Sequence, residues 1–95
     1  MITIADLLRD CLAEEDYTVP NGTGIDPFDR RNLVSIADGI MICSDWHRGE
    51  NRLDVWQDPS GRNAGITYRV DENGTVAPGS AEVVPVKATY MIEEA

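Results

Sequence analysis

The residues best suited to catalysis lie close together in the middle of the chain. Cys43, Asp45 and His47 place a thiol, a carboxylate and the chain's one imidazole within five residues. A nucleophile activated by a neighbouring base is the chemistry that such a set supports. In an extended strand, however, side chains on one face lie about 7 Å apart, which is beyond hydrogen-bond reach. We therefore expect a buried cysteine, a loop histidine and no catalytic residues; the alternative is a small enzyme that uses His47 with a nearby carboxylate.

The sequence has too few suitable residues for a metal site or a phosphate-binding loop. Zinc sites usually take three or four ligands from Cys and His, and the chain holds three such residues in total: Cys11, Cys43 and His47. The segment Asp71–Gly74 lacks the alternating ligands of a calcium loop and is typical of a turn. The Gly-rich stretches lack phosphate-loop spacing. We therefore expect no metal and no cofactor.

Acidic residues at helical spacing favour binding over catalysis. Asp6, Asp10 and Glu14 stand four residues apart, on the face opposite the leucines of an expected helix. Carboxylates about 6 Å apart along a helix resemble a row of phosphates, and such a row suits a basic nucleic-acid-binding groove. Glu15 and Asp16 continue the acidic run at the helix end where the macrodipole disfavours anions. The alternative interpretation is a solvated face that keeps the protein soluble.

A tryptophan among acids is the second candidate contact. Trp56 lies between Asp54 and Asp58 in a strand expected over Arg52–Gln57. An exposed aromatic side chain in that setting is typical of an interface anchor. If the helix or a loop covers this face of the strand, Trp56 is instead a core residue, and the same two interpretations apply to Trp46. The candidate partner-binding residues are thus Asp6, Asp10, Glu14, Glu15, Asp16, Asp54 and Trp56.

The first element that must position these residues is an N-terminal helix. Apolar residues recur at helical spacing at Ile4, Leu7, Leu8, Cys11 and Leu12. Thr3 as N-cap with Asp6 three residues later is a capping-box pattern. The sequence therefore predicts an amphipathic helix over Ile4–Glu15.

A loop and a short second helix are expected next. Asn21–Gly24 is typical of a loop. Asp26 as cap and a proline in the first turn predict at most one short helix, near Pro27–Arg31. We expect Arg30 and Arg31 to pair with the adjacent acids in solvent; the alternative is that they bind a carboxylate of a partner.

From Asn32 onward the hydrophobic period is two, which indicates strands. Asp38-Gly39 between apolar runs is a strong hairpin signal, so strands are expected over Asn32–Ala37 and Ile40–Trp46, followed by a polar loop at His47–Asn51. Three further strands are expected over Arg52–Gln57, Ile66–Val70 and Val86–Ile92. The predicted fold is α+β in one domain of residues 1–95, with an N-terminal amphipathic helix packed on an antiparallel β-meander of about four to six strands.

The charge balance limits the classes of partner. Seventeen Asp and Glu against eight Lys and Arg give a net charge of −9, which disfavours direct binding to nucleic acid or membranes and favours basic protein surfaces. A domain of 95 residues is too small to enclose a deep active site. The start of the chain lacks the pattern of a signal peptide, so we expect a complete cytoplasmic protein with Cys11 and Cys43 reduced.

In size, acidity and lack of motifs the chain resembles the small inhibitors that phages and mobile elements carry against host defences, including anti-CRISPR proteins. The resemblance is one of type, and no residue pattern matches a particular family. It implies a small acidic binding protein without catalytic activity, a nucleic-acid mimic that occupies a basic surface of a larger nucleic-acid-binding partner.

Two other classes of function remain open. The first is a homo-oligomeric structural or assembly protein, such as a small virion or scaffold component, that forms a homodimer through its last strand. The second is adaptation to high salt, in which the acids serve solubility alone.

Overall fold

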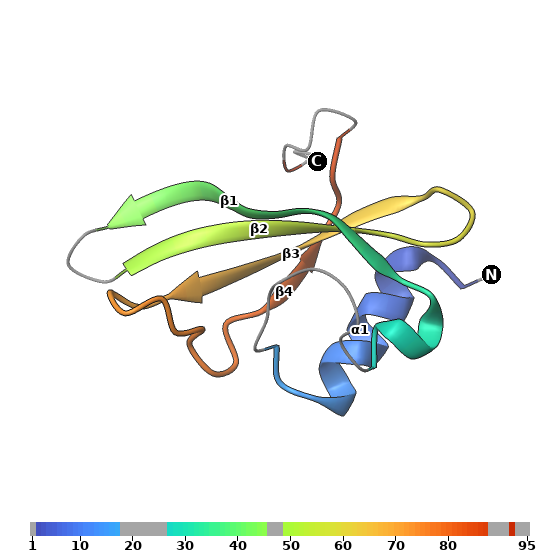
Figure 1. The fold of residues 1–95 in the computed structure, drawn as a ribbon, viewed down its shortest axis with the longest axis horizontal. Coiled ribbons are helices and arrows are strands. Elements are labelled where there is room, and N and C mark those ends of the chain that lie inside the picture. Colours follow the sequence, from blue (N-terminus) through green and yellow to red (C-terminus); the bar gives the residue numbers. More distant parts are fainter. Residues whose placement is uncertain (1, 18–26, 46–48, 88–91, 93–95) are drawn as a thin grey trace.

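One helix and a four-stranded antiparallel sheet make up the fold, which confirms the predicted α+β meander (Figure 1). The structure is a computed structural model that describes residues 2–17, 27–45, 49–87 and 92, with the backbone alone at residues 43–45. The helix packs against one face of the sheet, on its third and fourth strands. None of the described helices is both long enough and apolar enough to cross a membrane.

Helix α1, Ile4–Glu14, forms where the sequence predicts it. The Thr3 hydroxyl accepts a hydrogen bond from the Asp6 backbone N–H, and the Asp6 carboxylate accepts one from the Thr3 N–H, each at 3.1 Å. This capping box satisfies two backbone donors that the first helical turn leaves without a partner. The helix ends one residue earlier than predicted, and the Glu15 N–H donates to the Cys11 carbonyl at 3.2 Å.

The strands lie in the sheet in chain order, which makes the sheet a meander. They are β1 (Val34–Asp45), β2 (Gly49–Gln57), β3 (Asn63–Val70) and β4 (Glu82–Val84). The central pair, β2 and β3, keeps one unbroken antiparallel register along its length. Residues 49–51, expected in a loop, belong to β2: all three pair with β1, and Glu50 and Asn51 also pair with β3.

The predicted hairpin at Asp38-Gly39 is wrong, because β1 runs through it as one strand. Ala37 pairs with Val55 and Ile40 with Leu53, so two residues of β1 stand opposite one residue of β2. Gly39 has a φ of +63°, a conformation that suits a β-bulge as well as a hairpin turn. The Asp-Gly pair therefore marks a bulge, one of three register shifts between β1 and β2.

The last predicted strand, Val86–Ile92, falls in large part outside the described residues. Pro85 cannot donate to a sheet, and β4 ends before it, at Val84. Val86 forms an isolated bridge with Ile92, and residues 88–91 lie outside the described residues.

The second helix is a single 3-10 turn, η1, at Asp29–Arg31. It lies within the predicted range, but Phe28 occupies the N-cap position and no side chain caps the turn. The predicted cap, Asp26, and the predicted loop at Asn21–Gly24 lie outside the described residues.

The main core fills the space between α1 and the sheet. Its buried members are Ile4, Leu8, Cys11, Tyr17, Phe28, Leu33, Trp56, Ala64, Ile66, Tyr68 and Val70. Leu53 and Val55 are buried on the opposite face of the sheet, since successive strand residues point to opposite sides. There a Cβ on Gly65 would lie 2.5 Å from Leu53 Cδ1 and 2.6 Å from Val86 Cγ2, so a larger residue would force these side chains to shift. Both faces of β2 are therefore covered.

Candidate functional site

The five predicted acids at the N-terminal end of the chain are all exposed. Asp6, Asp10 and Glu14 lie on α1, and Glu15 and Asp16 follow it. The helix turns its apolar residues toward the sheet, so these acids lie on or next to its solvent side. The structure thus places all five on the surface, along α1 and directly after it.

Two of the five acids have partners within the protein. Asp6 binds the Thr3 backbone, and its Oδ1 lies 3.3 Å from Arg9 Nη1. Glu14 accepts hydrogen bonds from both Arg30 and Arg31. The Thr3 backbone N–H is the main cause that lowers the pKa of Asp6, and the hydrogen bonds from the two arginines lower the pKa of Glu14.

Arg30 and Arg31 share one acid, Glu14, that the prediction did not name. We expected adjacent acids as partners, and η1 places both guanidinium groups at Glu14, at the C-terminal end of α1. The two cations offset the unfavourable interaction of Glu14 with the helix macrodipole. Glu14 therefore helps to hold η1 against α1.

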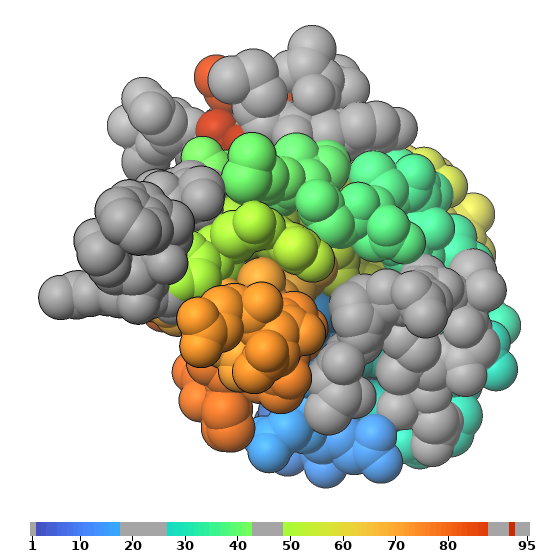
Figure 2. All heavy atoms as spheres, turned by 60° about the vertical axis from the view of Figure 1, so that its left-hand side comes forward, coloured from blue at the N-terminus to red at the C-terminus, as the bar shows by residue number. Residues whose placement is uncertain are grey.

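The other three of these five acids have no ion pair within the described residues: Asp10, Glu15 and Asp16. We call these three residues the α1 acidic surface. Figure 2 shows the end of α1, in blue, beside the β3–β4 connection, in orange. Asp16 and Tyr17 line a small hollow there together with Gly79 and Ala81.

Trp56 and Asp54 are not on the surface. Trp56 is 1% exposed and Asp54 is 0% exposed, which corrects their interpretation as exposed interface residues. The face of β2 that holds Trp56 packs against the main core, where Phe28 stacks on the indole at 4.3 Å between ring centroids. Trp56 is therefore a core residue and Asp54 a buried carboxyl group.

Asp54 is the centre of a buried hydrogen-bond network that joins four parts of the chain. Its Oδ1 accepts from the Tyr68 hydroxyl and from the Gly39 N–H, both at 2.8 Å. Its Oδ2 accepts from the Tyr17 hydroxyl, which in turn accepts from Trp56 Nε1 at 3.1 Å. All these donors are uncharged, so the network satisfies the carboxylate without a cation.

Burial and hydrogen bonding act in opposite directions on Asp54. Burial raises the pKa of Asp54, whereas the hydrogen bonds from Tyr17, Gly39 and Tyr68 lower it; the net pKa is raised. Burial is also the main cause that raises the pKa of Tyr17 and of Tyr68, and the nearby Asp54 adds to it. Both phenols therefore stay protonated and donate to Asp54 throughout the neutral range.

Tyr17 links the buried network to the α1 acidic surface. It directly follows Asp16, and its ring lies 5.8 Å from Phe28 and 5.3 Å from Tyr68 between centroids. A buried ring with a bonded hydroxyl fixes the backbone beside it. The predicted residues Asp16, Asp54 and Trp56 are thus connected, through a side chain that the sequence did not single out.

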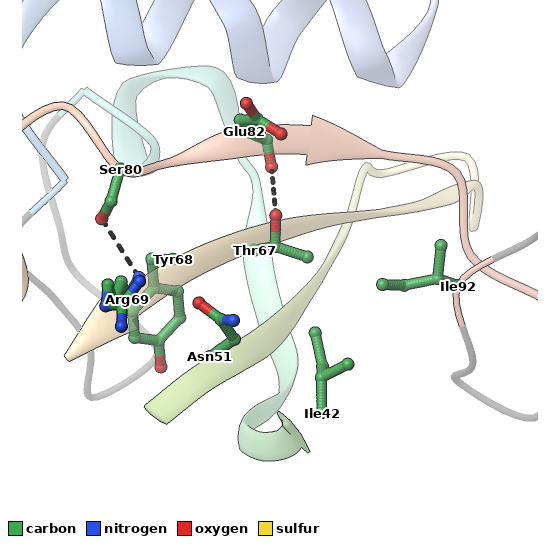
Figure 3. Close-up of a pocket in the computed structure, with 8 residues that line it drawn as sticks. All are labelled: Ile42, Asn51, Thr67, Tyr68, Arg69, Ser80, Glu82 and Ile92. Atoms are coloured by element: carbon green, nitrogen blue, oxygen red, sulfur yellow. Dashed lines mark hydrogen bonds between the residues drawn. The ribbon is translucent and has the colours of Figure 1, made fainter. Parts of the chain in front are cut away.

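A groove crosses the sheet between β1 and β4 and has a volume of about 410 Å³ (Figure 3). It is lined by Ile42, Asn51, Thr67, Tyr68, Arg69, Ser80, Glu82 and Ile92. Figure 3 shows Ile42 and Ile92 together at one end, and Ser80 and Arg69 at the other, where the Ser80 hydroxyl accepts from the Arg69 N–H at 3.1 Å. The groove is therefore aliphatic at one end and polar at the other.

The candidate catalytic set cannot be assembled from the described atoms. His47 lies outside the described residues, as do the side chains of Cys43 and Asp45. Cys11 is buried, and burial raises the pKa of its thiol, which disfavours the reactive thiolate. Among the described residues no three potential ligands lie close enough to hold a metal ion.

Tyr17, Tyr68 and Gly39 are the residues of the network that the sequence analysis missed. One signal was present: an aspartate inside the apolar run Leu53–Trp56 is expected to need buried donors if both faces of the strand are covered. Tyrosine is a common donor in that situation because its ring is apolar and its hydroxyl is polar. Which tyrosines serve is decided by the fold and not by local pattern.

Comparison of the chain with protein-family models, with curated proteins and with solved structures finds no match.

Proposed function

We propose that the protein is a non-enzymatic inhibitor that acts in the cytoplasm by occupying a basic, nucleic-acid-binding surface of a larger protein. The contact is made by the α1 acidic surface, Asp10, Glu15 and Asp16. Buried Asp54 and Trp56 bond the hydroxyl of Tyr17, the residue after Asp16, and do not touch the partner.

The observation that carries the proposal is the contrast among the acids of α1. Asp6 and Glu14 are neutralised by arginines of the same chain, whereas Asp10, Glu15 and Asp16 are exposed and have no ion pair within the described residues. An exposed carboxylate without an ion pair keeps its full attraction for an external cation. The net charge of −9 adds long-range attraction to any basic surface.

Anchoring supports the proposal as well. Glu15 and Asp16 lie between the end of α1 and the buried ring of Tyr17, so both ends of this short acidic segment are held. A contact surface that is already ordered loses less conformational entropy on binding. An ordered set of exposed carboxylates is what a mimic of a phosphate backbone requires.

The test is capture of partners from a bacterial lysate with three tagged proteins. The first is the wild type, and the second is the surface variant Asp10→Asn, Glu15→Gln, Asp16→Asn. The third is a control, Asp71→Asn, Glu72→Gln, Glu82→Gln, which removes three exposed acids from β4 and the turn after β3. Because the two variants have the same net charge, a difference between them reports position and not total charge.

We expect the wild type and the control to retain a nucleic-acid-binding protein that high salt or added DNA releases, and the surface variant to lose it. Equal retention by both variants would reject the α1 acidic surface as the contact. Retention that neither DNA nor salt reverses would reject nucleic-acid mimicry.

A further inference from the structure

The outer edge of β1 is a second exposed surface, with a chemistry of its own. β1 is the terminal strand of the sheet, so within the described residues no strand pairs with its outer side. It carries Met41 at 59% exposure and Ile42 at 43%. Large apolar side chains at this exposure on an edge strand are typical of a site where another chain pairs.

The register of β1 limits what can pair with it. Register shifts lie between Ala37 and Ile40 and again between Met41 and Cys43. Bulges bend an edge strand and interrupt its row of backbone donors and acceptors. The edge therefore suits a short segment of two or three residues next to Ile40 and Met41, and not a long added strand.

Charge disfavours a second copy of this chain as the occupant. The two acids of β1, Asp38 and Asp45, are placed symmetrically about Met41 and Ile42. In an antiparallel pair of two copies centred on that point, Asp38 of each chain would stand opposite Asp45 of the other. Like charges opposite one another destabilise a pair of strands. Any other register still joins two chains of net charge −9. A segment with basic residues on both sides of its apolar centre complements this edge.

The groove in Figure 3 adds a place for an apolar side chain. Its aliphatic end is formed by Ile42 of β1 and by Ile92. A residue of the docked segment that lies beside Ile42 can therefore bury its side chain against both isoleucines. Pairing of main chains with a nearby pocket for one side chain is the usual combination in strand addition.

We propose that the outer edge of β1 binds a short extended segment of another protein, with one or two apolar residues against Met41 and Ile42 and a Lys or Arg on each side. This surface is separate from the α1 acidic surface, and the inference does not rest on the proposed function. It assigns the protein a second contact, one that recognises an exposed basic and apolar segment.

The test uses two peptides of known sequence and the amide NMR spectrum of the full chain. The probe is acetyl-Arg-Val-Ile-Val-Arg-amide, and its counterpart is acetyl-Glu-Val-Ile-Val-Glu-amide. We expect the arginine peptide to shift the amide signals of Ile40, Met41 and Ile42 in a saturable manner. The glutamate peptide should bind roughly tenfold more weakly, because two favourable charge pairs become repulsive.

A matched pair of variants locates the site. Met41→Lys with Ile42→Lys should abolish binding of the arginine peptide, whereas Ile2→Lys should leave it unchanged. Ile2 is the fitting control because it is also a large apolar residue, 64% exposed, at the N-terminal end of the chain. All three side chains are exposed, so the variants should keep the wild-type fold, which the same spectra verify.

Three results would overturn the proposal. They are equal affinity for the two peptides, signal shifts outside β1 and the groove, and a concentration-dependent dimer without peptide whose interface maps to Met41 and Ile42. The last result would assign the edge to a second copy of the chain.

Discussion

The Asp54 network and the α1 acidic surface place carboxyl groups in opposite environments, although Asp16 and Tyr17 are neighbours in sequence. Asp54 is fully buried and bonded to Tyr17, Tyr68 and the Gly39 N–H. Glu15 and Asp16 are exposed and have no ion pair within the described residues. The same functional group thus stabilises the fold in one place and is left for an external partner in the other.

Burial decides whether an acid of this protein can act in folding or in binding. A buried carboxylate that accepts hydrogen bonds from three donors is out of a partner's reach, and its loss leaves those donors unsatisfied. An exposed carboxylate contributes little to folding, so its replacement is tolerated. Substitutions in the two regions should therefore separate stability from binding.

The largest effect is expected from Trp56→Ala in the buried region. Removal of an indole that is 1% exposed and stacked on Phe28 should lower the free energy of unfolding by about 3–5 kcal/mol. Urea unfolding measures it. A change below about 1 kcal/mol, together with lost partner binding, would return Trp56 to the surface role that the sequence first suggested.

A smaller loss is expected from Tyr17→Phe. Without the hydroxyl, Asp54 Oδ2 loses its donor and Trp56 Nε1 loses its acceptor, which should cost about 1–3 kcal/mol of unfolding free energy. Tyr68→Phe is the matched control, because Oδ1 still accepts from Gly39, and its cost should be about 1 kcal/mol. Equal costs for the two variants would show that Tyr17 is no special link in the network.

The pH dependence of stability should carry the signature of Asp54. Because burial holds the folded-state pKa of Asp54 above the ordinary value of 3.8, the folded state binds a proton more tightly than the unfolded state. The stabilising contribution of Asp54 to the free energy of unfolding is present at low pH and is lost as pH rises from 3.8 through the raised pKa. The difference in unfolding free energy between wild type and Asp54→Asn should therefore shrink over this range.

Asp58 should produce the opposite trend and thus provides an internal control. Burial alone would raise the pKa of Asp58, but hydrogen bonds from Ser60 and Arg62 outweigh it and lower the pKa to about 2. The stabilising contribution of Asp58 to the free energy of unfolding is lost as pH falls from 3.8 toward 2. Urea titrations of wild type, Asp54→Asn and Asp58→Asn across the acidic pH range separate the contributions of Asp54 and Asp58 to the free energy of unfolding. A wild-type advantage over Asp54→Asn that grows with pH would contradict the environment described for Asp54.

The smallest effect is expected on the surface itself. Glu14→Gln should lower stability slightly, because it weakens the contact with Arg30 and Arg31, whereas Asp10→Asn should leave stability unchanged. Thermal unfolding of both variants at low salt measures the difference, and high salt should reduce it. A larger loss from Asp10→Asn than from Glu14→Gln would mean that Asp10 has an unrecognised structural partner.

The parts of the fold that the sequence predicts are those set by local interactions. Helix α1 depends on a capping box of Thr3 and Asp6 and on apolar residues at helical spacing, and both signals are complete within its own range. The prediction of a hairpin at Asp38-Gly39 was wrong because a positive φ at Gly39 suits a β-bulge equally well. The choice between the two depends on pairing with β2 and on Asp54, which lies fifteen residues from Gly39.

The candidate site was predictable in composition but not in arrangement. The acids of α1 are where the helix period places them, yet the pairing of Glu14 with η1 depends on how two separate segments pack. Trp56 and Asp54 were assigned to a surface because strand alternation cannot tell whether the second face of a strand is covered. In this protein α1 and Phe28 cover it.

The most direct test of the central claim is an amide NMR titration with acetylated octa-arginine of the wild type, the surface variant and the control variant. We expect the signals of Asp10, Glu15 and Asp16 to shift first, added salt to weaken binding, and the surface variant to lose far more affinity than the control. Equal weakening of both variants, with shifts spread over all exposed acids, would contradict it and leave the acidic residues with solubility as their role.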